Sequence, residues 1–124
     1  MLFEHRHKVF RPNGRVDYVM FWLLLEHPWR EVDTYLWDDL AEVGFPQSDI
    51  ARLSLRDLLV FTLTVPGSPT WKHLAVNWTD DGFPVDTTLA FALEQMIAAK
   101  QISQHDRHRA MKARARWKRE QEQP

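Results

Sequence analysis

The chain has 124 residues, with 16 Lys or Arg, 17 Asp or Glu and no cysteine, and its formal net charge is −1. This length suits one compact domain with appendages, and the lack of cysteine excludes a disulfide framework, a thiolate metal site and a cysteine nucleophile. The longest apolar run, Val19–Leu25, is far shorter than a membrane span. We therefore expect a soluble protein of the reducing cytoplasm with no membrane partner.

The charges are divided unevenly along the chain. Residues 1–99 hold 8 Lys or Arg and 14 Asp or Glu, whereas residues 100–124 hold 8 and 3. The body is therefore acidic and the tail is basic. This asymmetry indicates a tail that either reaches for an acidic partner or folds back on its own body, rather than a uniformly basic nucleic-acid binder.

The first segment, residues 1–27, can form an arm or a hairpin. Asn13-Gly14 is a strong turn signal between short β-leaning runs at Lys8–Arg11 and Arg15–Val19. An isolated two-stranded hairpin is marginal in water, so these arms need the body or a partner. The run Val19–Glu26 could equally open a helix, because periodicity alone does not separate the two structures.

A helix is predicted over residues 29–43. His27-Pro28 interrupts the preceding pattern, and proline is well tolerated in a first helical turn. Gly44 suits the position after the last turn, and Pro46 stops the helix from continuing. The apolar side chains recur at steps of three and four and form one face, made by Trp29, Val32, Leu36, Leu40 and Val43.

The central helix, predicted over residues 54–64, has the densest apolar surface of the chain. Ser54 and Asp57 form a capping-box pattern, in which each side chain can accept a hydrogen bond from a backbone N–H of the first turn. The break at Pro66–Pro69 ends the helix. Because the segment is apolar nearly all round, we expect the residues on either side of it to bury it.

Two further helices are predicted after this break. The first covers residues 70–76 and is followed by a loop over residues 78–85, because Asp-Asp-Gly is turn chemistry. The second runs over residues 87–102 or beyond, with Asp86 or Thr87 as its cap. The expected fold is therefore mainly α, a small helical domain of about four helices with a hairpin before it and a basic helical extension after it.

Residues 103–124 form the basic tail, which has good helix propensity but no continuous apolar face to bury. The tail is therefore either a solvated extension of the last helix or a segment that becomes ordered on binding. Its cations are our candidate partner-binding residues, together with two tryptophans for which we expect no core partners. The set is Trp22, Trp117, Arg107, Arg109, Lys112, Arg114, Arg116, Lys118 and Arg119.

The sequence offers little for catalysis or for metal binding. Two histidine pairs have spacings that could place imidazoles together, but a metal site needs a third or fourth ligand. We interpret Asp38-Asp39 as a solvated helix face and Asp80-Asp81 as part of a turn. There is no glycine-rich phosphate loop, nucleophile elbow or His-Glu-x-x-His pattern, so we predict no enzyme, no cofactor and no metal. The histidine pairs are His5 with His7 and His105 with His108.

Five features between residues 35 and 97 follow one another in a recognisable order. They are a helix ending in glycine at Tyr35–Phe45, the Leu-Ser-Leu-Arg-Asp-Leu helix at Leu53–Phe61, the break at Pro66–Thr70, Trp78, and the helix at Thr87–Leu93. In this order they resemble a family of small tail-module proteins of tailed phages that infect actinobacteria, usually described as tail assembly chaperone-like. Residues 1–30 and the basic tail have no counterpart in that pattern.

The resemblance implies a non-enzymatic protein-binding module that assists phage tail assembly by binding the tape measure or the tail-tube protein in the host cytoplasm. One alternative is a virion structural component, such as a head–tail connector or minor tail protein, whose arm is ordered by neighbouring copies of the chain. Another is a nucleic-acid-binding regulator that acts through the basic tail, which we favour less because no known nucleic-acid-binding fold accompanies it.

Overall fold

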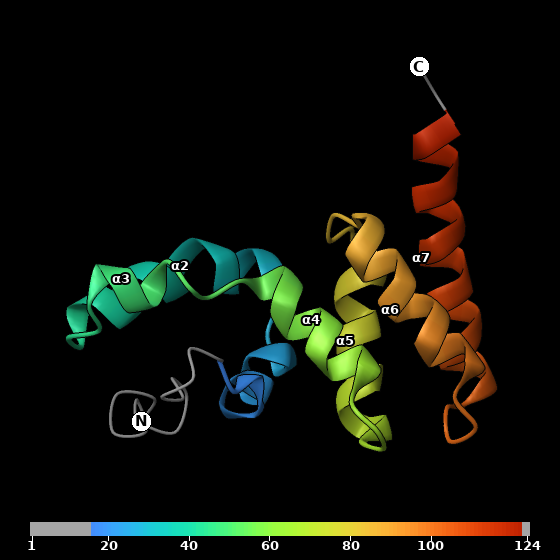
Figure 1. Cartoon of the computed structure of the whole chain (residues 1–124), viewed down its shortest axis with the longest axis horizontal. Coiled ribbons are helices and arrows are strands. Elements are labelled where there is room, and N and C mark those ends of the chain that lie inside the picture. The colour runs from blue at the N-terminus through green and yellow to red at the C-terminus, as the bar shows by residue number, and fades with distance from the viewer. Residues whose placement is uncertain (1–15, 123–124) are drawn as a thin grey trace. The chain divides into compact units, whose positions relative to one another are not determined.

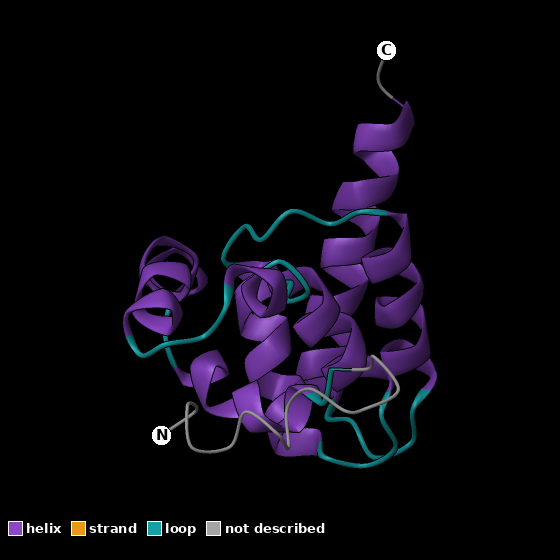
Figure 2. Ribbon diagram, turned by 60° about the vertical axis from the view of Figure 1, so that its left-hand side comes forward, coloured by secondary structure: helices purple, strands orange, loops and turns teal. Residues whose placement is uncertain are grey.

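The computed structural model describes residues 16–122, and this part of the chain is mainly helical. Figures 1 and 2 show helices joined by short loops. This confirms the predicted mainly α fold class, whereas the hairpin predicted around Asn13-Gly14 lies outside the described residues. The helices are η2 (Tyr18–Glu26), α2 (Trp29–Glu42), α3 (Gln47–Ile50), α4 (Leu55–Thr64), α5 (Pro69–Asp80), α6 (Thr87–Ala98) and α7 (Gln104–Glu122).

The chain divides into two compact units, and the division falls between Leu58 and Leu59, inside α4. Unit 1 holds η2, α2, α3 and the first turn of α4. Unit 2 holds the rest of α4 with α5, α6 and α7. Each unit has buried apolar side chains of its own, so each is described by itself below.

A 3₁₀ helix opens the described part of unit 1. Of the two structures that the sequence left open for Val19–Glu26, the helical one is present, and the Asp17 carboxylate caps it by accepting from the Val19 N–H at 3.1 Å. Three residues per turn place Tyr18, Phe21 and Leu24 in one row. This row lines a small apolar pocket together with Leu36, Trp37, Leu53, Ser54, Leu55 and Leu58.

Helix α2 follows its predicted bounds to within one residue and buries Val32, Leu36 and Leu40 of the predicted face. Gly44 ends it as predicted, with φ at +98°, a conformation that glycine adopts without a Cβ clash. The Phe45 N–H donates to the Leu40 carbonyl and the Gly44 N–H to the Ala41 carbonyl. These two bonds are the Schellman arrangement, which satisfies carbonyls at the helix end.

The start of α4 confirms half of the predicted capping box. The Ser54 Oγ accepts from the Asp57 N–H at 3.2 Å. The Ser54 N–H, however, donates to the hydroxyl oxygen of Tyr18 at 3.2 Å, and the Asp57 carboxylate lies 3.1 Å from Arg56 Nε. Tyr18, 36 residues earlier in the sequence, therefore accepts from the Ser54 N–H in place of Asp57. The spacing of Ser54 and Asp57 does not predict this contact.

In unit 2, helix α5 is longer than predicted. The loop predicted over residues 78–85 is wrong for its first three residues, which complete the last helical turn. Gly82, at φ +93°, acts as the residue after the helix end, with the Phe83 N–H on the Trp78 carbonyl at 3.0 Å. The Trp78 and Phe83 rings also stack at 6.0 Å, which is the apolar contact that accompanies a Schellman end. Trp78 is consequently a core residue.

Helix α6 is capped by Asp86, whose carboxylate accepts from the Leu89 N–H at 2.9 Å. It ends at Ala98, short of the predicted residue 102, and α7 begins as a separate helix at Gln104. Helix α7 packs on α5 and α6 and buries Ala110 and Ala113. The expectation that this segment has no face to bury is therefore wrong, because small alanine side chains permit close helix packing without large apolar residues.

We expect replacement of Tyr18 by Phe to lower the free energy of unfolding by about 1 kcal/mol, because it removes the acceptor for the Ser54 N–H. Burial, and then the charge of Asp57, raises the pKa of Tyr18 above 10.0. A raised folded-state pKa gives a stabilisation that is complete below the unfolded pKa and is lost as the pH rises through the folded-state value. Urea unfolding between about pH 8 and pH 11 should therefore show an alkaline loss of stability that is smaller in Tyr18→Phe.

The matched control is Tyr35→Phe, which removes the hydroxyl of an exposed tyrosine in the same unit. This variant should keep the alkaline loss of the native chain. Equal pH profiles for the native chain and Tyr18→Phe would contradict the role of the Tyr18 hydroxyl.

Candidate functional site

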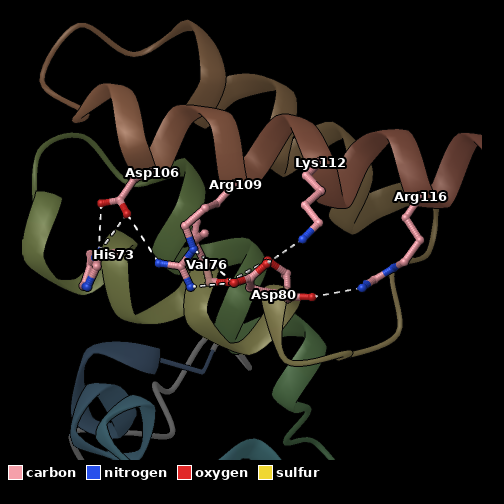
Figure 3. A network of polar contacts seen from close by, with 8 residues as sticks. His73, Val76, Asp80, Asp106, Arg109, Lys112 and Arg116 are labelled. Carbon is pink, nitrogen blue, oxygen red and sulfur yellow. Dashed lines mark hydrogen bonds and ion pairs between the residues drawn. The ribbon is translucent and has the colours of Figure 1, made fainter.

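The basic side chains of α7 make polar contacts with α5, its neighbour in unit 2 (Figure 3). Arg109 forms an ion pair with Asp80 at 3.2 Å and lies 3.6 Å from Asp106 on its own helix. Lys112 lies 3.9 Å from the other oxygen of Asp80. Asp80 thus belongs to a helix end and an ion-pair network, rather than to the turn predicted from the sequence.

A histidine contact extends this network at the start of α7. His73 Nδ1 lies 2.8 Å and 3.0 Å from the two carboxylate oxygens of Asp106, which is buried. The same aspartate forms the ion pair with Arg109 and, through its own backbone N–H, donates to Ser103 Oγ at 3.1 Å. The first turn of α7 is therefore fixed to α5 by side chains on both helices.

Two arginines of α7 bind helix ends instead of carboxylates. Arg116 donates to the carbonyl oxygens of Thr79 at 3.2 Å and Phe83 at 3.1 Å, where α5 terminates. Arg107 donates to the carbonyls of Ile97, Ala99 and Ile102, where α6 terminates. A guanidinium presents several donors in a fixed plane, which suits such a cluster of carbonyl oxygens.

The structure therefore engages five of the seven cations predicted to bind a partner, because Arg114 also lies 3.5 Å from Glu94. Lys118 and Arg119 are exposed and have no ion-pair partner within residues 16–122. Of the two predicted uses of the basic tail, folding back on its own body is the one present in unit 2. Partner binding by this set stays a prediction.

The two candidate tryptophans are both half-buried. Trp117 has its indole Nε1 atom buried without a hydrogen-bond partner in the described part of the chain. Trp22 lies in η2, where its exposure is also intermediate. Neither presents a fully exposed ring, so the aromatic side chains on the surface lie elsewhere.

A groove of unit 1 lies on η2 and α2 and has a volume of about 290 Å³. Tyr35 stands at its edge with 60% of its surface exposed, between Glu31 and Asp39, four residues away on either side. This spacing places the three side chains in one line along α2. The groove is lined by Leu24, His27, Glu31, Val32, Tyr35, Leu36 and Asp39. We call it the α2 groove.

Further apolar surface lies on η2, where Val19 is 44% and Leu23 is 66% exposed. Three residues per turn place Val19 and Leu23 on rows of η2 other than that of Leu24, so they are separate exposed side chains rather than part of the groove. The α2 groove is not among the sites predicted from the sequence, because the candidate contact residues there were two tryptophans and the cations of the basic tail. The spacing of Glu31, Tyr35 and Asp39 was a readable signal, since it places an aromatic side chain on the acidic face of the helix.

Metal binding and membrane insertion find little support in the described residues. Within residues 16–122, no three His, Asp or Glu side chains gather in a way that could hold a metal ion. His108 accepts from the Gln104 side chain at 3.0 Å, while His5 and His7 lie outside the described residues. None of the described helices combines the length and hydropathy that crossing a bilayer requires.

We expect Arg116→Ala to lower the free energy of unfolding of unit 2 by about 1–3 kcal/mol, because two carbonyl oxygens at the end of α5 lose a charged donor. Arg116→Lys should fall between the native chain and the alanine variant, since an ammonium cannot reproduce the planar fork. The control Lys118→Ala removes an exposed cation from the same helix and should change stability by less than about 0.5 kcal/mol. Urea unfolding followed by tryptophan fluorescence measures all three, and equal effects of Arg116→Ala and Lys118→Ala would contradict the capping role.

A chain that ends at Ile102 lacks α7, and with it both arginine caps and the buried alanines. We expect this chain to lose the cooperative unfolding transition of unit 2, whereas a chain that ends at Glu120 should keep it. Near-ultraviolet circular dichroism during heating reports the packing of the tryptophans, of which Trp78 is buried in unit 2. Coincident transitions for the two shortened chains would show that α7 is dispensable for folding.

Comparison with family models, with curated proteins and with solved structures gives no match. The resemblance to phage tail-module proteins therefore rests on the sequence features alone.

Proposed function

We propose that the protein is a non-enzymatic protein-binding module that assists phage tail assembly, and that the α2 groove is its binding site. The observation that carries this proposal is the exposed Tyr35 beside an apolar groove with carboxylates at its edge. An apolar centre with a polar rim is the usual anatomy of a protein–protein interface, and tyrosine is enriched among residues that dominate binding energy.

The chemistry of the groove favours one kind of partner segment. Leu24, Val32 and Leu36 offer an apolar floor, while Glu31 and Asp39 offer negative charge. An amphipathic helix with an apolar face and flanking Lys or Arg matches both properties, and such a helix in a groove is a recurrent mode of recognition. Charge at the rim favours fast association and specificity more than high affinity, which suits a chaperone that must release its client.

The resemblance to tail assembly chaperone-like proteins supplies the biological setting of this proposal. In that setting the partner is the tape measure protein or the tail-tube protein. The specific part of the resemblance, Leu53–Asp57, covers the capped start of α4, which packs with η2 in the core of unit 1. This motif supports the fold of the unit that carries the groove, rather than the groove itself.

Two other functions compete with this proposal. A virion component would use the same surface against copies of itself or against other structural proteins, and would remain in the particle. Nucleic-acid binding through α7 has less support, since most of its cations already contact carbonyl or carboxylate oxygens of unit 2.

The test is co-expression of the full chain with the proteins of adjacent genes, followed by pull-down and measurement of the affinity for any captured partner. We expect Tyr35→Ala to weaken binding about tenfold or more, which corresponds to loss of at least about 1.4 kcal/mol. The matched control is Phe91→Ala, which removes an aromatic ring that is 58% exposed on unit 2. It should bind like the native chain.

The charged rim gives a second readout. Glu31→Gln with Asp39→Asn should slow association and reduce its dependence on salt. Capture of a partner whose affinity is unchanged by Tyr35→Ala but reduced by Phe91→Ala would place the binding site on unit 2. A defined oligomer that captures no neighbour would favour the virion component instead.

A further inference from the structure

A second pocket, in unit 2, has a chemistry that the proposed function does not use. It has a volume of about 260 Å³ and lies where the turn between α6 and α7 meets the start of α5. Its lining combines two cations and one neutral amide with small and apolar residues, and no carboxylate lines it. The lining residues are Gly67, Lys72, Ala99, Lys100, Gln101 and Ile102.

Lys72 is the unusual member of this set, because only 3% of its surface is exposed. Its Nζ atom donates to the Thr62 carbonyl at 2.9 Å and to the Val65 carbonyl, at the end of α4. An ammonium group has three N–H donors, so one remains beyond these two bonds. Both acceptors are neutral carbonyls, and burial lowers the pKa of Lys72 from its ordinary value. The buried charge is thus only partly compensated by the protein itself.

The turn that closes the pocket is arranged so that it does not repel negative charge. Arg107 donates to the carbonyl oxygens of Ala99 and Ile102 in this turn. The partial negative charge of these oxygens would repel an anion, and the hydrogen bonds from the guanidinium reduce this repulsion. Lys100 is exposed on the same turn, and the Gln101 amide adds a neutral donor.

We propose that this pocket binds a small oxyanion, a phosphate or a carboxylate group, through Lys72 and Lys100. The bound anion compensates the charge of the buried Lys72 ammonium and accepts a hydrogen bond from its third N–H. The exposed Lys100 contacts the same anion from the solvent side. The pocket volume is several times the share of a water molecule in liquid water, so the group fits with part of a larger ligand attached. Charge-assisted hydrogen bonds of this kind are among the strong ones in proteins.

The test is a nuclear magnetic resonance titration of the full chain with inorganic phosphate, at an ionic strength held constant with chloride. We expect saturable shifts of the backbone amides of Gly67 and of residues 99–102. Acetate, titrated in the same way, identifies the class: binding of both anions assigns a general oxyanion site, and binding of phosphate alone assigns a phosphate site. Absence of saturable shifts with both anions overturns the proposal.

Matched variants separate this pocket from the general positive charge of α7. Lys100→Gln should weaken phosphate binding about tenfold, and it should leave the fold intact because Lys100 is exposed. Lys118→Gln removes the same charge from an exposed position of unit 2 and should leave the affinity unchanged. Lys72→Met should abolish binding, and where it prevents folding, the comparison of Lys100→Gln with Lys118→Gln decides. Equal losses in those two variants overturn the proposal.

Discussion

The feature on which unit 2 depends is the donation of hydrogen bonds by a cation to the carbonyl oxygens at a helix end. Lys72 serves α4, Arg116 serves α5 and Arg107 serves α6. Every helix leaves four carbonyls unpaired at its end, and these oxygens carry the negative pole of the helix dipole. In helices of ten to twelve residues the unpaired groups are a large share of the backbone, so their partners matter as much as the apolar core.

This use of charge changes the meaning of the basic composition of α7. Seven cations on one helix suggest a surface for nucleic acid or for an acidic protein. Two of them, however, donate to backbone carbonyl oxygens of unit 2, and three others form ion pairs with its carboxylates. Unit 1 has the opposite character, since its acidic side chains on α2 face outward and flank exposed apolar groups. The internal bonding of unit 2 and the open surface of unit 1 are the basis for assigning recognition to the α2 groove.

Several elements could be predicted from the sequence because their causes are local. The apolar periodicity and the glycine after the helix predicted α2. Ser54 predicted the start of α4, and Asp86 predicted the start of α6. Gly82 was predicted to belong to a loop over residues 78–85, whereas it follows the end of a helix that reaches Asp80, because turns and helix ends use the same residue. Its role was settled by stacking of Trp78 on Phe83, a contact that depends on the finished fold.

The contacts that could not be predicted join residues far apart in the sequence. The Tyr18 hydroxyl at the start of α4 is one, and the arginines of α7 on α5 are others. Neither spacing nor composition encodes which carbonyl a long side chain will reach. The α7 helix was also underestimated because its buried face consists of Ala110 and Ala113, which hydropathy patterns hardly register. The candidate groove was missed for a related reason, since Tyr35 occupies the polar face of a helix whose apolar face was the one sought.

The order of the elements along the chain has a consequence for synthesis on the ribosome. Lys72 lies eight residues after the end of α4 and donates to the Thr62 carbonyl in its last turn. Arg116 and Arg107, by contrast, lie on the last described helix. The carbonyl oxygens that they contact near the ends of α5 and α6 gain these donors only when that helix has been made. Domains that fold during translation complete their N-terminal parts first. Unit 1 can therefore form while the later helices are still being made, whereas the carbonyl oxygens of Thr79, Phe83 and Ala99 lack their arginine donors until α7 has been synthesised.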